Sequence, residues 1–423
     1  MGVKLSVVGG GSSYTPELVE GFSNRADRIP VDELVLLDPD TERLDVVGGL
    51  AGRMLARAGW NGSLVCTTDR DRALDGAGFV VVQLRIGGQA ARLLDETIPL
   101  EFGCIGQETT GAGGFAKALR TVPVVLDLAE ETARRGAPGA WIVDFTNPTG
   151  IVTQALLDHG HRAVGLCNVG IGAQRWLAEI LGVDPGRVEI DHVGLNHLSW
   201  VRGVRLEGAD VLGELLGDRG EALAERFDWP LPFLREIRAI PSYYLRYYYR
   251  EREMLEHQRG HPTRAEEVQK IEAELFELYR DPELDHKPEQ LSRRGGAVYS
   301  AAAAQLIASL HDGAGDLQIV NVRNEGTIPG LADADVVEVP ARVDRTGAGP
   351  APVEPLAPEM LGLVQHTKAY EHLAVESAVS GSRSAALRAL LANPLVRDAA
   401  VAEPLLAALL DANRSHLPRF FPA

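Results

Sequence analysis

Short apolar runs alternate with amphipathic stretches over the first part of the chain. The runs are rich in Val, Leu and Ile, and stretches between them, such as 16–22 and 44–58, carry apolar residues at helical spacing. Continuous apolar strands separated by helices are typical of a parallel sheet covered on both faces. We therefore predict an α/β fold whose strands include residues 4–8, 33–37, 79–84, 141–145 and 163–166.

The second half of the chain has a less regular pattern. Residues 189–201 are expected to form one strand, which carries His197. Residues 263–280 are expected to form a helix, because Thr263 followed by Glu266 fits a capping box at its start. The other expected elements are a helix at 243–252, a strand near 336–339, a loop at 346–358 and a helical tail from 359 to about 415.

Composition and charge exclude several classes of protein. The 423 residues, 45% hydrophobic and 24% charged, suit a globular protein of two domains or of one large one. No apolar run approaches the roughly 20 residues that span a bilayer, and the N-terminus lacks a signal-peptide pattern. The net charge of −17 disfavours nucleic acid as a partner. Three widely spaced cysteines fit a reducing compartment. We therefore expect a cytoplasmic protein with no membrane or nucleic-acid partner.

A glycine-rich turn follows the first predicted strand and precedes a predicted helix. Glycines there let the backbone approach a pyrophosphate at the N-terminus of the helix. Gly9 and Gly11 fit the first two glycines of a G-x-G-x-x-G pattern, whereas Tyr14 stands in place of the third. The second strand ends in Asp38, where an acid binds the ribose hydroxyls and favours NAD over NADP. The predicted cofactor contacts are Gly9, Gly11, Ser12, Ser13 and Asp38, although a glycine turn in an unrelated α/β protein has the same local pattern.

Polar residues also stand at the ends of the later strands, where open parallel sheets bind their ligands. These are Arg85, Asn147 and the pair Cys167-Asn168. Cys167 and His197 are candidate metal ligands, and two protein ligands would leave positions for substrate oxygens, as in a catalytic site. A buried cysteine and a hydrogen-bonded core histidine remain the alternative.

Residues 241–249 form the densest aromatic cluster of the chain. At helical spacing, most of its tyrosines are expected to pack in the interior. A tyrosine can still act as a general base where a nearby cation lowers its pKa.

With these residues in view, the chain resembles the NAD-dependent glycosidases of glycoside hydrolase family 4, and most of all their 6-phospho-β-glucosidase branch. The resemblance implies an N-terminal Rossmann dinucleotide-binding domain, at 1–170, and a C-terminal α+β domain like that of lactate and malate dehydrogenases, at 171–423. It also implies NAD⁺, a divalent metal that is typically Mn²⁺, and homodimers or homotetramers. The segments that carry it are VVGGGSSYTPELVEGF, QETTGAGG, DFTNPTGIVTQAL, LCNVG, VGLNHLSW, IPSYYLRYYY and HPTRAEEV.

The same resemblance assigns roles to individual residues. Cys167 and His197 become the metal ligands, and Tyr244 becomes the catalytic base. The α-linked branch of the family carries an acid after the metal cysteine, and Asn168 in that place favours the β branch. The implied substrate contacts are Arg85, Asn147, Asn168 and Arg264, with the two arginines on the phosphate and Ser13 near the same end of the sugar.

The reaction implied is hydrolysis of 6-phospho-β-glucosides such as cellobiose 6-phosphate. NAD would oxidise C3 of the sugar, a base would remove the C2 proton, the group at C1 would be eliminated, water would add, and the ketone would be reduced again. Most glycosidases use two carboxylates instead, and the NAD-dependent members of this family are a known exception.

Two departures and three alternatives accompany this interpretation. Gly170 stands where the β enzymes usually have a proline, and Ala301 stands where an acidic residue is common. Both departures affect the expected leaving-group side of the pocket. The alternatives are a glycosidase of the same family that acts on unphosphorylated glycosides, a malate- or lactate-type NAD dehydrogenase that accumulates NADH, and a non-enzymatic NAD-binding regulator.

Overall fold

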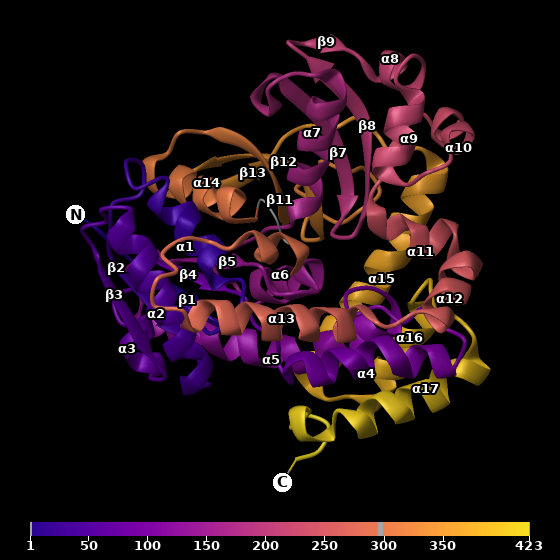
Figure 1. Ribbon diagram of the computed structural model, residues 1–423. Helices are drawn as coiled ribbons and strands as arrows, with labels where there is room; N and C mark the ends of the chain where they lie inside the picture. The colour runs from indigo at the N-terminus through magenta and orange to yellow at the C-terminus, as the bar shows by residue number, and fades with distance from the viewer. Residues whose placement is uncertain (1, 295–298, 423) are drawn as a thin grey trace.

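A nine-stranded sheet forms the centre of the protein (Figure 1), whose computed structural model describes residues 2–294 and 299–422. Its strand order is β13-β12-β11-β6-β5-β4-β1-β2-β3. The strands from β3 to β6 along this order are parallel and follow the 3-2-1-4-5-6 arrangement of a Rossmann fold. The predicted α/β class and its predicted strands are confirmed. The parallel strands are β1 (Val3–Val8), β2 (Val31–Leu37), β3 (Ser63–Thr67), β4 (Phe79–Val82), β5 (Trp141–Asp144) and β6 (Ala163–Gly165).

The second half of the chain extends this sheet with antiparallel strands. β11 (Asp316–Arg323) pairs with β6 through Asn321 and Gly165, and β12 (Val336–Asp344) pairs with β11. β13 (Gly347–Pro350) pairs with β12, so the loop predicted at 346–358 is wrong over these residues. Glycine and proline are tolerated there because β13 is an edge strand. The division of the chain at residue 170 stays a prediction.

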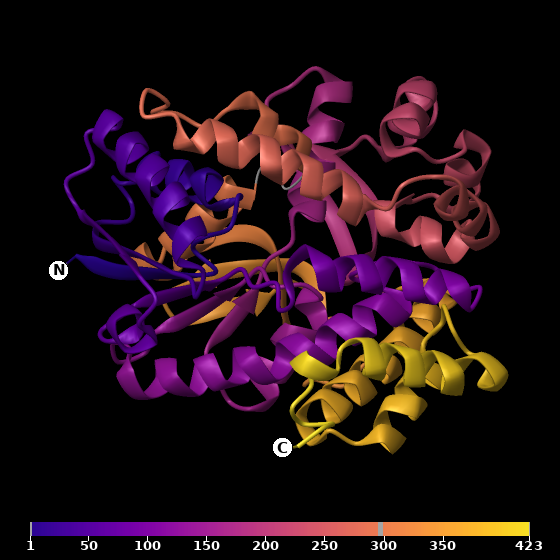
Figure 2. The same ribbon diagram turned by 60° about the horizontal axis from the view of Figure 1, so that its bottom comes forward.

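Side chains alternate between the two faces of the sheet and enter two separate cores. Leu5 and Val7 belong to one core, whereas Val8 belongs to the other. The first core includes residues of α1 (Thr15–Ser23), α2 (Thr41–Arg57), α7 (Asn168–Leu181), α13 (Arg264–Arg280) and α14 (Tyr299–Asp312). The second includes residues of α3 (Arg70–Leu74), α5 (Gly111–Arg135), α6 (Thr149–Asp158), α15 (Pro358–Ser380), α16 (Arg383–Ala392) and α17 (Ala399–Ala412), and Figure 2 shows α5 and the C-terminal helices together below the sheet.

The segment 189–201 forms a hairpin rather than the single strand that its pattern predicted. β7 (Val188–Leu195) and β8 (Leu198–Leu206) are antiparallel, and Asn196 and His197 form the connection between them. His197, the second residue of the connection, has a φ of 63°, in the left-handed region that the second central residue of a tight turn can adopt. The turn places His197 at the tip of the hairpin. β9 (Ala209–Asp210) and β10 (Ile240–Pro241) pair with β8 and complete this second sheet.

The helix predicted at 243–252 is divided into shorter pieces. They are the 3-10 turn η2 (Tyr243–Leu245), α11 (Arg246–Tyr249) and α12 (Glu251–Gly260), and the break falls at Arg250, whose φ is −128°. The capping box of Thr263 and Glu266 at the start of α13 is confirmed, as is the helical tail. The remaining helices are α4 (Gly88–Glu101), α8 (Leu212–Leu216), α9 (Gly220–Phe227), α10 (Leu231–Ile237), η1 (Pro185–Arg187), η3 (Glu289–Arg294) and η4 (Arg414–His416).

The described helices include none that is both long and apolar enough to cross a membrane.

The junction between β6 and β11 predicts an effect on stability. A Cβ atom at Gly165 would lie 2.1 Å from Oγ1 of Thr153 and 2.9 Å from Cβ of Asn321. We expect Gly165→Ala to lower the free energy of unfolding by about 1–3 kcal/mol through overpacking, measured by urea denaturation. The matched control is Gly172→Ala in α7, where a Cβ atom meets nothing within 4 Å, and it should raise that free energy by about 0.5–1 kcal/mol. Equal effects of the two substitutions would contradict the packing described for this junction.

Candidate active site

A pocket of about 510 Å³ lies at the carboxyl ends of the parallel strands. Arg85, Asn147 and Asn168 line it, and they follow β4, β5 and β6 respectively. Tyr244 and Arg264, from the second half of the chain, line the same pocket, as does Ser12 of the glycine turn. The fold therefore brings together polar residues that the sequence placed at separate strand ends.

The glycine turn fits the close approach of a dinucleotide. Gly9 has a φ of 88°, and a Cβ atom there would lie 2.6 Å from the carbonyl oxygen of Gln83. Asp38 accepts a hydrogen bond of 2.9 Å from the backbone N–H of Gly11, so the acid at the end of β2 lies against the turn. The turn leads directly into α1, whose N-terminus favours a phosphate charge. These residues fit NAD⁺.

Ser12 and Ser13 differ in their surroundings. Ser12 lines the pocket, whereas Ser13 is fully buried. The Ser13 hydroxyl donates a 2.7 Å hydrogen bond to Glu272, and its carbonyl oxygen accepts one of 2.7 Å from the Tyr279 hydroxyl. Both partners lie on α13, so Ser13 holds that helix against the glycine turn. The sequence reasoning identified Ser13 but neither of its partners.

Both predicted metal ligands lie close to the predicted base. The His197 ring stacks on the Tyr244 ring, with a centroid distance of 3.6 Å and an interplanar angle of 14°. Cys167, the N-cap residue of α7, is buried and close enough to Tyr244 for its charge to raise the pKa of the phenol. A thiol, an imidazole and a phenol from three distant segments therefore converge.

The donor atoms of this cluster fit a catalytic metal. His197 is 2% exposed, and its Nδ1 is buried without a hydrogen-bond partner among the described residues. Burial lowers the pKa of His197 to about 4, so the imidazole is neutral, as a metal ligand must be. The described ranges 2–294 and 299–422 contain no group of three or more His, Cys, Asp and Glu side chains arranged to hold a metal. Cys167 and His197 offer a thiol and an imidazole close to Tyr244, two donors of the kinds that bind divalent metals.

The pKa of Tyr244 departs from its ordinary value. Burial raises the pKa of the phenol well above its usual value, and the charge of Cys167 raises it further. A tyrosine in this state holds its proton at neutral pH. Positive charge bound at Cys167 and His197 would act in the opposite direction and favour the phenolate.

The two predicted phosphate-binding arginines already have protein partners. Arg85 binds both carboxylate oxygens of Glu108, from a side chain that is 25% exposed. Arg264 is 44% exposed; it donates to Glu267 at 2.9 Å and to the carbonyl oxygens of Arg293 and Arg294 at 3.0 and 3.2 Å. Both guanidinium groups are held in place at the pocket wall.

Glu108 is the centre of a charged cluster that the sequence reasoning missed. Its carboxylate lies 2.7 Å from the Lys117 ammonium and 3.3 Å from the Arg92 guanidinium, in addition to Arg85. Burial by itself would raise the pKa of Glu108, but the three cations hold it well below its usual range. Burial also lowers the pKa of Lys117 to about 7. Lys117 could have revealed this cluster from the sequence, because it is a charged residue within the largely apolar first turns of α5.

Glu338 on β12 supports the hairpin that carries His197. Its carboxylate accepts hydrogen bonds from Nε2 of His192 at 2.9 Å and from Nδ2 of Asn196 at 2.9 Å. Nδ2 of Asn321 donates to the same carboxylate at 3.1 Å. All of these side chains except Asn196 are fully buried, so the network fixes the residue next to His197 against the main sheet.

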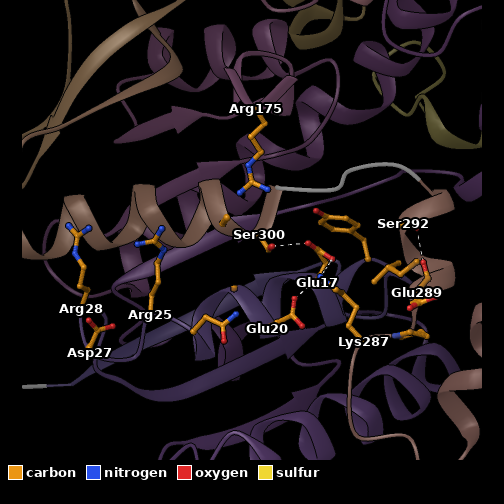
Figure 3. Close-up of a pocket in the computed structure, with 16 residues that line it drawn as sticks. Glu17, Glu20, Arg25, Asp27, Arg28, Arg175, Lys287, Glu289, Ser292 and Ser300 are labelled. Carbon is orange, nitrogen blue, oxygen red and sulfur yellow. Dashed lines mark hydrogen bonds and ion pairs between the residues drawn. The ribbon is translucent and has the colours of Figure 1, made fainter. Parts of the chain in front are cut away.

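Gly170 and Ala301, the two residues that differ from the usual pattern of the β enzymes, lie at different places in the fold. Gly170 packs against Ile319, because a Cβ atom at Gly170 would lie 2.7 Å from its side chain. Ala301 lines a separate cavity of about 760 Å³ beside α1. In this cavity the Lys287 ammonium forms ion pairs with the carboxylates of Glu17, at 2.8 Å, and Glu20, at 2.5 Å (Figure 3). These three charges are therefore paired with one another. Ala301 therefore lies outside the pocket lined by Tyr244.

Comparison with known proteins decides the family. The model of the family 4 glycosyl hydrolases matches residues 4–183, and the model of the family 4 glycosyl hydrolase C-terminal domain matches residues 192–396. This chain belongs to glycosyl hydrolase family 4. The resemblance found in the sequence is confirmed.

Relatives within family 4 match over nearly the whole chain. A Bacillus subtilis protein named "Probable 6-phospho-beta-glucosidase" is 46% identical over 99% of this chain and 98% of its own length. The 6-phospho-beta glucosidase of Thermotoga maritima, solved with manganese, NAD⁺ and glucose-6-phosphate, has a TM-score of 0.92 at 37% identity, covering 98% of this chain and 99% of its own.

The expected similarity to dehydrogenases is also confirmed at the level of the fold. Malate dehydrogenase from Plasmodium falciparum has a TM-score of 0.53 at 13% identity, covering 89% of this chain and 98% of its own. Family 4 thus shares the architecture of a Rossmann domain joined to a lactate/malate-dehydrogenase-like domain. The roles of individual site residues stay predictions.

The charged cluster at Glu108 predicts a large effect on stability. We expect Glu108→Gln to lower the free energy of unfolding by about 3–5 kcal/mol, because it leaves buried cations without their counter-charge. Glu267→Gln is the matched control, since Glu267 lines the same pocket and binds an arginine but is 50% exposed. The control should change stability by less than about 0.5 kcal/mol. Urea denaturation of both variants measures the difference, and similar values would contradict the central place of Glu108.

Proposed function

We propose that this family 4 member hydrolyses the glycosidic bond of 6-phospho-β-glucosides, such as cellobiose 6-phosphate, with NAD⁺ and a divalent metal, Mn²⁺, as cofactors. The observation that carries the proposal is the single pocket that joins Arg85, Asn147, Asn168, Tyr244 and Arg264. The names of the Bacillus subtilis relative and of the Thermotoga maritima structure, with its bound NAD⁺, manganese and glucose-6-phosphate, support it.

The phosphate of the substrate would bind where cations exceed carboxylates. Arg85 and Arg264 would contact it by charge-assisted hydrogen bonds. Arg92, Lys117 and Arg294 line the same pocket and add positive charge. A chain of net charge −17 therefore presents a locally positive wall to an anionic sugar.

The proton chemistry would take place at the Tyr244 hydroxyl. Cys167 and His197 would hold the metal, and Asn147 and Asn168 would orient the sugar hydroxyls. When bound, NAD⁺ would accept and later return the C3 hydride, and the metal would stabilise negative charge on the sugar oxygens. Tyr244 would accept the C2 proton at its phenolate oxygen. Its ring stacks on that of His197, one of the two proposed metal ligands.

The alternatives have less support. Asn168 follows the metal cysteine where the α branch carries an acid, which favours β-linked substrates. A hydrolase of unphosphorylated glycosides would have little use for so many cations in the pocket. A malate- or lactate-type dehydrogenase would not need a thiol and an imidazole beside a tyrosine. A regulator without activity would not need the base. We also propose that the protein is cytoplasmic and forms homodimers or homotetramers.

The function predicts a specific pattern of cofactor and substrate dependence. The protein should hydrolyse p-nitrophenyl β-glucoside 6-phosphate in the presence of both NAD⁺ and Mn²⁺, with no net accumulation of NADH. Omission of NAD⁺, or treatment with EDTA, should abolish p-nitrophenol release, and Mn²⁺ should restore it after EDTA. The unphosphorylated glucoside is the control. Hydrolysis that survives EDTA would disprove the metal requirement, and steady NADH formation would indicate a dehydrogenase.

The proposed base predicts a rate effect confined to one tyrosine. Tyr244→Phe should lower kcat on the order of 10²–10⁴-fold, because the substitution removes the group that accepts the C2 proton. Tyr249→Phe is the control in the same aromatic cluster, since Tyr249 lies outside the pocket and is 40% exposed. Steady-state kinetics of both variants, with circular dichroism to confirm folding, measure the effect. A normal kcat for Tyr244→Phe would show that another group takes the proton.

A further inference from the structure

Glu272 is a carboxylate of α13 that lies behind the wall of the catalytic pocket. Its residue is 8% exposed, and the described residues that line the pocket include Arg85 and Arg294 but not Glu272. Neither the proposed proton transfer nor the proposed metal site uses it. A buried carboxylate is costly unless it is paired and hydrogen-bonded, so its partners indicate what it does.

One oxygen of this carboxylate joins the glycine turn to the pocket wall. Oε1 accepts a hydrogen bond of 2.7 Å from the Ser13 hydroxyl. The same oxygen accepts two hydrogen bonds from the Arg294 guanidinium, 3.2 Å from Nη2 and 3.4 Å from Nε. Ser13 belongs to the turn that fits NAD⁺, whereas Arg294 lines the pocket. Two segments that are distant in sequence therefore share one acceptor atom.

The other oxygen reaches the segment that follows Arg85. Oε2 accepts a 3.2 Å hydrogen bond from Nε2 of Gln89, in the first turn of α4. Although burial lowers the pKa of the Arg85 guanidinium, the charges of Glu108 and Glu272 raise it, so Glu272 lies close to Arg85 as well. The carboxylate is thus placed behind two arginines of the wall that would bind the phosphate.

Arg43 extends this network along the cofactor turn. Its Nη2 lies 3.8 Å from Oε1 of Glu272, and its Nε donates a hydrogen bond of 3.2 Å to the carbonyl oxygen of Gly11. The guanidinium also lies 4.4 Å from the ring centroid of Phe276, on the same helix as Glu272, which restricts its position. The glycine turn is therefore held at Gly11 and at Ser13 by groups that contact one carboxylate.

We propose that Glu272 is a positioning residue for two ligands, NAD⁺ and the phosphate of the sugar, and that it touches neither. It orients Ser13 and Arg43 beside the cofactor and Arg294 beside the phosphate. The inference rests on the proposed function, because it needs both ligands in these places. Long side chains lose rotamer freedom when they bind a ligand, and a partner that holds them beforehand removes part of that cost. Loss of Glu272 should therefore weaken the binding of both ligands.

Electrostatic repulsion by itself predicts the opposite result for the phosphate. A carboxylate behind the arginines repels a phosphate dianion, so removal of its charge alone would tighten phosphate binding. Glu272→Ala removes both the charge and the hydrogen-bond acceptor, whereas Glu272→Gln removes the charge but keeps one acceptor oxygen for Ser13 and Arg294. The two variants therefore separate the orienting role of Glu272 from its charge.

Isothermal titration calorimetry tests the role, with NAD⁺ alone and then with glucose 6-phosphate at saturating NAD⁺. In Glu272→Ala both dissociation constants should rise about 3–10-fold, the cost of ordering one freed side chain. Glu272→Gln should recover most of this loss. The matched control is Glu274→Ala on the same helix, because Glu274 is 53% exposed and pairs with Arg293; its constants should equal those of the wild type. The fitted stoichiometry reports the folded fraction separately from the affinity.

A double-variant cycle shows whether Glu272 acts through Arg294. Arg294→Ala should weaken the binding of glucose 6-phosphate but not that of NAD⁺, because Arg294 lies on the phosphate side. Glu272→Ala added to this variant should weaken glucose 6-phosphate less than it does in the wild type. Full additivity of the two substitutions would show that Glu272 does not orient Arg294.

The outcomes separate this inference from the proposed function. If the wild-type protein binds both ligands, but Glu272→Ala leaves either dissociation constant unchanged or lowered, or Glu272→Gln recovers nothing, the positioning role is wrong and the function stands. If the wild-type protein binds neither NAD⁺ nor glucose 6-phosphate, the proposed function fails and this inference fails with it.

Discussion

The geometry of the site depends on the hydrogen bonds that the buried carboxylate of Glu338 accepts. It accepts hydrogen bonds from His192 and Asn196 of the β7–β8 hairpin and from Asn321 of the neighbouring strand. A buried charge is costly unless it is fully hydrogen-bonded, and here the bonds come from segments far apart in sequence. The carboxylate thereby fixes the turn beside His197, and that turn places the imidazole against the Tyr244 ring.

A second carboxylate, Glu108, organises a cluster of cations at the same pocket, close enough to His197 and Tyr244 for its charge to affect the pKa of both. Arg85, Arg92 and Lys117 would repel one another in a buried space, and Glu108 contacts all three. One anion among three cations leaves local positive charge while keeping each cation in place. The arrangement suits an anionic substrate in an acidic protein, because the charge that matters is the one at the pocket wall.

Under the proposed function, the two groups of residues would divide the chemistry between them. The cations around Glu108 would provide charge for a phosphate, and Cys167, His197 and Tyr244 would act on the reacting sugar carbons. Phosphate binding and proton transfer would then take place within one pocket, in a chain that belongs to family 4.

The sequence by itself determined five of the six parallel strands described, all but β3, together with the glycine turn with Asp38, the capping box of α13 and the family. Each of these is written in contiguous residues as an apolar run or a motif. Only the tertiary structure decided the hairpin at His197, since apolar alternation continues through a two-residue turn and hides it. The tertiary structure alone also paired Arg85 with Glu108 and brought the Tyr244 ring onto that of His197. Such contacts join positions that no local period connects, so they depend on how the sheet and the hairpin pack against each other.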